Sequence, residues 1–194
     1  MTGGKLYSVS ESYRIFVQGM RTIRYLSRAK RNKELSPEFI ERIMIAVTEV
    51  NGCDICSYAH TKMALEIGMG DEEIKALLSG VIDDIPTDEL PAVLFAQHYA
   101  DKRARPSKKS WEKIIEDYGQ KKAMGILGAI RIIMVGNVFG IPSSSFFNRF
   151  KGKPDKRSTF LYEIGMIASF IILTPIAIFH AMISSLLKGP IIDF

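Results

Sequence analysis

Apolar residues recur at intervals of three and four along most of this chain, which is the spacing of a helix face. Between Tyr13 and Leu26, for example, the apolar residues fall on one helical stripe. The sequence contains no repeated runs of β-branched residues with a period of two, the pattern that indicates strands. It therefore predicts an all-α fold, with a helical domain followed by a C-terminal apolar helix.

Local signals mark where several of these helices begin and end. Ser8 and Glu11 have the spacing of a capping box, and Ser36-Pro37 places a proline at the first position of the next helix. Gly119 ends a helix that begins near Ser110. We expect the longer apolar helix that follows, from Gln120 to Phe139, to be stopped by Gly140-Ile141-Pro142, because proline disrupts a helix interior.

Charge and apolar content divide the chain into four segments. These are an N-terminal basic amphipathic helix (1–35), a helical core (36–142), a basic linker (143–160) and an apolar helix (161–188). Arginines opposite the apolar stripe of the first helix fit a solvated face better than a membrane surface or an acidic partner. A net charge of +5 is too small for a nucleic-acid arm, so we expect no nucleic-acid partner.

The last segment contains 165–187, a stretch without Asp, Glu, Lys or Arg. It is long enough to cross a bilayer, which takes about 20 residues. A helix that is apolar on all sides either spans a membrane or is wholly buried. We expect a single membrane anchor, the alternative being a helix buried in an oligomer core. Basic residues precede this stretch and only Lys188 follows it, which predicts a cytoplasmic domain. The first twelve residues lack an apolar run, so we expect no secretory leader.

Both cysteines of the chain lie in one motif, Cys53-Asp-Ile-Cys56, followed by His60. On a helix these three side chains share one face. The preceding Asn51-Gly52 turn puts the thiols in the first helical turn, where free N–H groups and the helix dipole stabilise a thiolate. His60 can accept or relay the thiol proton. Because two thiols at this spacing can close into a disulfide and reopen, the motif predicts a redox dithiol that needs no metal or other cofactor.

Three other interpretations of the cysteines compete with a redox dithiol. Buried cysteines are often inert small hydrophobes. A zinc site would use Cys53, Cys56 and His60 with a fourth ligand such as His98 or Glu41, but the sequence has no second CxxC and no histidine pair. A thioredoxin-type motif requires a βαβ context that an all-α chain lacks. We favour the redox dithiol.

Taken together, the stretch from Glu41 to His60 resembles the carboxymuconolactone decarboxylase / alkyl hydroperoxidase D family. The family pattern is a glutamate, a CxxC motif beginning twelve residues later, and a histidine four residues after the second cysteine. Glu41, Cys53, Cys56 and His60 match each position, and Asn51-Gly52 matches the usual lead-in. The likeness extends over roughly 36–142.

This resemblance implies a helical alkyl hydroperoxidase D-like domain that assembles into trimers or hexamers. The branch with CxxC reduces hydroperoxides, or passes electrons from an external dithiol such as a lipoyl group to a partner peroxidase. The resemblance also implies that Cys56 is the peroxide-attacking thiolate and Cys53 the resolving thiol, with His60 and Glu41 as a proton relay. The decarboxylase branch generally lacks CxxC, which disfavours lactone decarboxylation here.

The residues themselves leave several points open. Spacing does not separate Glu41 from Glu49 as the carboxylate near His60, and the reverse assignment of the two cysteines is the alternative. Because Cys53 is nearer the helix start, we expect it to be the better exposed thiol. The alternative functions are a non-catalytic or zinc-stabilised binding module at the membrane, and a lactone decarboxylase-like enzyme.

Overall fold

The computed structural model describes residues 5–192 and 194, and these residues form seven helices and no strand. The predicted all-α class is therefore confirmed, as is the presence of a C-terminal apolar helix. The helices are α1 (Val9–Arg31), α2 (Pro37–Asn51), α3 (Asp54–Glu66), α4 (Asp71–Leu78), α5 (Leu90–Asp101), α6 (Lys108–Phe150) and α7 (Phe160–Leu186).

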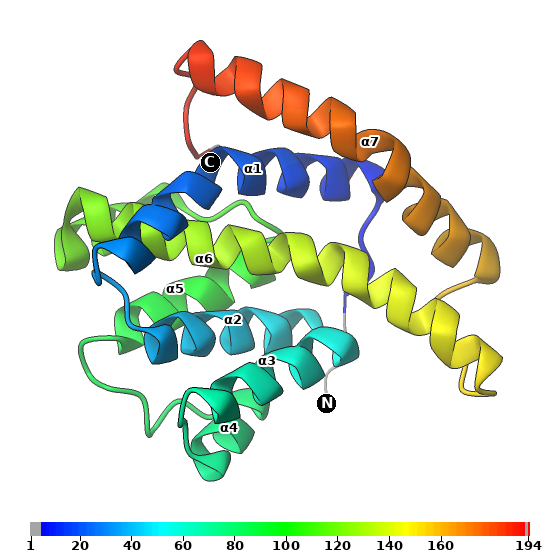
Figure 1. The fold of residues 1–194 in the computed structure, drawn as a ribbon, viewed down its shortest axis with the longest axis horizontal. Helices are drawn as coiled ribbons and strands as arrows, with labels where there is room; N and C mark the ends of the chain where they lie inside the picture. Colours follow the sequence, from blue (N-terminus) through cyan, green and yellow to red (C-terminus); the bar gives the residue numbers. More distant parts are fainter. Residues whose placement is uncertain (1–4, 193) are drawn as a thin grey trace.

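Helix α6 crosses the middle of the molecule, with α1 and α7 on one side and α2 to α5 on the other (Figure 1). Its apolar stretch is almost entirely buried and forms the centre of the main hydrophobic core. Helix α1 joins the same core and approaches α6 closely at Gly128. A Cβ atom at Gly128 would lie 3.0 Å from the carbonyl oxygen of Thr22 and from the backbone nitrogen of Leu26, so only glycine fits without a shift.

The predicted helix boundaries follow local chemistry where the signals are strong. Ser8 and Glu11 form the reciprocal capping box at the start of α1. The Ser36 hydroxyl accepts a hydrogen bond from the Phe39 backbone N–H at the start of α2. Gly119 has a φ of 70°, which breaks the helical path between the two parts of α6.

The helix end predicted at Phe139, before Gly140-Ile141-Pro142, is wrong, because α6 continues through Pro142 to Phe150. Proline removes one backbone hydrogen bond, but tertiary contacts hold the following turns. Arg149 pairs with Glu163 of α7, and the Phe146 ring stacks on Phe160. The predicted linker 143–160 is therefore helical over its first part, and only 151–159 connects α6 to α7.

Candidate active site

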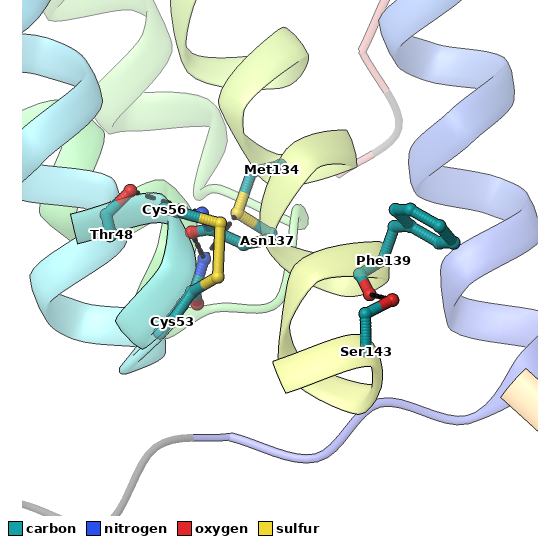
Figure 2. Close-up of a disulfide and its surroundings, with 8 residues drawn as sticks. Thr48, Cys53, Cys56, Met134, Asn137, Phe139 and Ser143 are labelled. Carbon is teal, nitrogen blue, oxygen red and sulfur yellow. Dashed lines mark hydrogen bonds between the residues drawn. A yellow bond between two sulfur atoms is a disulfide. The ribbon is translucent and has the colours of Figure 1, made fainter. Parts of the chain in front are cut away.

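The two cysteines lie where α2 ends and α3 begins. Gly52 adopts the left-handed conformation that ends α2, Cys53 is the N-cap residue of α3, and Cys56 lies in its first turn. Their sulfur atoms form a disulfide, which faces α6 (Figure 2). The Cys53 side chain makes no capping hydrogen bond, so the free N–H groups and the dipole at this helix end favour a thiolate once the disulfide is reduced.

Helix α6 packs directly on the sulfur atoms at Gly140. A Cβ atom there would lie 2.7 Å from the Cys53 sulfur and 2.8 Å from the Cys56 sulfur. Cys53 is 1% exposed and Cys56 is 8% exposed. The prediction that Cys53 is the better exposed thiol is therefore wrong, because a residue distant in sequence covers it. Solvent reaches the pair mainly at Cys56.

The carboxylate near His60 is Glu41, as the family pattern predicted. Its Oε2 atom lies 2.7 Å from Nδ1 of His60, and both side chains are largely buried between α2 and α3. When Nδ1 of His60 carries the ring proton and donates it to the Glu41 carboxylate in a hydrogen bond, Nε2 of the same ring is free to accept a second proton. His60 lies one helical turn after Cys56. Within the described part of the chain, neither sulfur atom hydrogen-bonds to His60.

Glu49, the rival carboxylate, lies at a different place. It is near Gly80, where a Cβ atom would be 3.7 Å from the Glu49 carboxyl group. Burial raises the pKa of the Glu49 carboxyl above its usual range. The structure thus separates two candidates that spacing alone could not, and it pairs Glu41 with His60.

A buried chain of polar side chains, which the sequence did not predict, lies next to the disulfide. The Tyr7 hydroxyl donates to Asn51, Asn51 donates to Asn137 of α6, and Asn137 donates to Thr48. Asn51 also contacts the sulfur of Met134, which lies beside Asn137 in Figure 2. These bonds fasten the end of α2 to α6 and so fix where α3 begins. In the sequence, the feature that could have indicated this buried polar chain was Asn137, a polar residue within an apolar helix.

A polar pocket of about 200 Å³ adjoins the start of α3. Gly52 and Asp54, which flank Cys53, form one wall, and Lys153 and Arg157 of the connection before α7 contribute to the other. Arg157 is held by an ion pair with Asp155, and this pair lowers the pKa of the Asp155 carboxyl. The pocket leaves room for a polar group close to the Cys53 end of the disulfide.

The described residues do not bring His98 to the cysteines. His98 lies on α5, where its Nε2 atom accepts a hydrogen bond from the Ser107 backbone N–H. No group of three or more His, Cys, Asp or Glu side chains suited to a metal ion occurs in the described part of the chain.

Comparison with protein families identifies one match. Residues 17–98 match the model of the carboxymuconolactone decarboxylase family, and this span contains Glu41, Cys53, Cys56 and His60. This match agrees with the predicted resemblance over residues 17–98, a span that begins within α1 and ends within α5 and so differs from the expected 36–142. Comparisons with curated proteins and with solved structures give no match.

Proposed function

We propose that this chain, which carries a domain of the carboxymuconolactone decarboxylase family over residues 17–98, is a thiol-dependent peroxidase of the alkyl hydroperoxidase D type. The observation that carries the proposal is the disulfide between Cys53 and Cys56 at the start of α3, one turn from the pair formed by His60 and Glu41. A nucleophile, a base and a group that orients the base are thus supplied by two adjacent helices.

The reaction begins with the reduced dithiol. His60 takes the proton of Cys56, and the thiolate attacks one oxygen of a hydroperoxide. The O–O bond breaks, the leaving alkoxide takes up a proton to give an alcohol, and Cys56 becomes a sulfenic acid. The Cys53 thiol then loses its proton and attacks the Cys56 sulfur, which forms the disulfide, and the hydroxide that leaves takes up a proton to give water. An external dithiol, such as a lipoyl group, reduces the disulfide by exchange and is itself oxidised. Alternatively, the reduced dithiol of this chain passes its electrons to a partner peroxidase instead of to a hydroperoxide.

Relative exposure supports the assignment of Cys56 as the attacking thiol. A peroxide must reach the sulfur, and Cys56 is the more exposed of the two. Cys56 is also nearer to His60 along α3. Cys53, packed against Gly140, needs only to reach its neighbour, which suits the resolving thiol.

Exposed apolar side chains around the disulfide support contact with other protein surfaces. Ile55 and Tyr58 of α3 flank Cys56 and are 48% and 74% exposed. In all, α3 buries only Cys56 and Ala64 within the described chain. A helix with so little buried surface fits an oligomer interface or the docking surface of the electron donor. We propose a homo-oligomer, a trimer or hexamer.

We also propose that the domain lies in the cytoplasm and that α7 attaches it to the membrane. A working dithiol suits a reducing cytosol. Helices α6 and α7 are both long and apolar enough to cross a membrane, but α6 is mostly buried in the core, whereas α7 is mostly not.

Thiol counting tests the proposed activity directly. One equivalent of hydroperoxide should consume two thiols of the reduced protein and yield one equivalent of alcohol, in a sample shown by metal analysis to be metal-free. Thiols that do not react with the peroxide would favour a binding module instead. Lactone decarboxylation that survives replacement of both cysteines would favour the other enzyme of the family.

A further inference from the structure

Helix α7 is fastened along its length to the rest of the domain. Its inward side packs on α1 and α6, with Phe170 between the rings of Phe16 and Phe139. Near its start, the fully buried Glu163 binds Arg149. Further along, the Tyr13 hydroxyl lies 2.9 Å from Nδ1 of His180. In Figure 1, α7 lies beside α1, and both helices run in the same direction.

The segment after α7 is tied down as well. Arg21 of α1 donates two hydrogen bonds of 2.7 Å to the carbonyl oxygens of Gly189 and Pro190. The buried Arg131 of α6 donates to the carbonyl oxygen of Ile191. If α7 and the segment after it detached, the buried guanidinium group of Arg131 would lose the carbonyl oxygen that accepts its hydrogen bond, which is unfavourable. Moving α7 across a bilayer with α1 attached would draw the arginines of α1 into hydrocarbon, which is also unfavourable.

The outward side of α7 is an apolar stripe. Its exposed members recur at helical spacing on one face of α7 and extend just past its end: Leu161, Ile171, Phe179, Met182, Leu186 and Leu187. Ile171 is 68% exposed and Leu186 is 79% exposed. At a rise of about 1.5 Å per residue, the stripe is roughly 39 Å long. We call it the α7 stripe.

Basic residues lie at both ends of the α7 stripe and along the groove beside it. Lys151 and Lys156 precede the stripe in the sequence and Lys188 follows it, all exposed. Arg24 lines a groove of about 400 Å³ between α1 and α7, together with Met182. The acidic groups described in this region are already paired, Glu163 with Arg149 and Asp155 with Arg157.

An apolar stripe with a basic margin is the surface that binds an anionic bilayer in the plane of its headgroups. A second copy of this chain would instead bring two basic margins together. We propose that α7 lies flat in the surface of an anionic membrane, with the α7 stripe below the headgroups, and does not span the bilayer. This inference refines the membrane attachment proposed above and is independent of the peroxidase chemistry.

Flotation of the purified full-length protein with vesicles tests the surface. We expect flotation with phosphatidylcholine vesicles that contain phosphatidylserine, and at least tenfold less with phosphatidylcholine alone. The double variant Ile171→Asn/Phe179→Asn should lose flotation and keep its hydroperoxide turnover. Leu94→Asn is the matched control, since Leu94 is 45% exposed on α5, and it should float normally. The proposal would be overturned if the wild-type protein does not float with the vesicles and sedimentation shows that it self-associates through α7.

Thiol labelling in cells distinguishes lying in the surface from spanning. In a Cys53→Ser/Cys56→Ser background, single cysteines are introduced as Lys156→Cys and Lys188→Cys. A membrane-impermeant maleimide should label neither in intact cells and both after lysis. Labelling of Lys188→Cys alone in intact cells would show that α7 spans the membrane and would contradict the inference, whatever the outcome of the peroxidase assays.

Discussion

Oε2 of Glu41 lies 2.7 Å from Nδ1 of His60, across the contact between α2 and α3. This contact fixes the orientation of the imidazole. It connects a carboxylate that is twelve residues before the first cysteine with the turn of α3 that follows the second.

Replacing this carboxylate should slow the peroxidase without unfolding the protein. For Glu41→Gln we expect kcat/KM for a hydroperoxide to fall about 10-fold to 100-fold. The larger of these losses equals the smallest contribution that is typical of a positioned acid–base group. Glu49→Gln is the control, because Glu49 lies near Gly80 instead. Steady-state kinetics over a range of pH would measure both. An equal loss in the two variants would remove Glu41 from the relay.

The close packing of Gly140 on the two sulfur atoms predicts an effect that depends on the redox state. Gly140→Ala inserts a methyl group less than 3 Å from both sulfurs of the disulfide, and overpacking of this kind costs about 1–3 kcal/mol. Free thiols can rotate away, so the reduced protein should lose less stability. Urea unfolding of both states measures the difference.

Gly136→Ala provides the control for this substitution. A Cβ atom at Gly136 meets only Ile133, at an ordinary contact distance of 3.7 Å. Since alanine favours helix, this variant should be neutral or more stable in both states. If Gly140→Ala behaves in the same way, the sulfur atoms are not held against α6 as described.

The buried polar chain predicts a structural cost next to the site. Asn137→Leu removes the amide oxygen that accepts from Asn51, which leaves Asn51 only the weak acceptor sulfur of Met134, and it removes the donor to Thr48. An unsatisfied buried polar group costs about 1–3 kcal/mol. Ser143→Ala is the control, because the Ser143 hydroxyl donates to the Phe139 carbonyl of the same helix and so does not join two helices (Figure 2). Chemical denaturation should show a clearly larger loss for Asn137→Leu, and equal losses would contradict the role of the chain.

Helix starts could be predicted from the sequence because the groups that cap them are three residues apart. Ser8 with Glu11 and Ser36 with Phe39 are of this kind. The end of α6 could not be predicted in this way. It depends on the contact between Arg149 and Glu163, two residues that only the folded chain brings together.

The site shows the same division between local and distant contacts. The disulfide joins residues three apart, and the spacing of the motif predicted it. The burial of Cys53 depends on Gly140, which is distant in sequence, so the sequence led to the wrong order of exposure. Glu41 and His60 are on separate helices, and only the family pattern identified their pairing.

The most direct test of the proposed function is to locate the sulfenic acid in single-cysteine variants. Reduced Cys53→Ser and Cys56→Ser proteins are treated with one equivalent of hydroperoxide and a sulfenic-acid trap, and the adducts are mapped by mass spectrometry. We expect a stoichiometric adduct on Cys56 in Cys53→Ser and none on Cys53 in Cys56→Ser, which should also lack turnover with a dithiol donor. Full turnover by Cys56→Ser, or a sulfenic acid on Cys53 alone, would contradict the proposed mechanism.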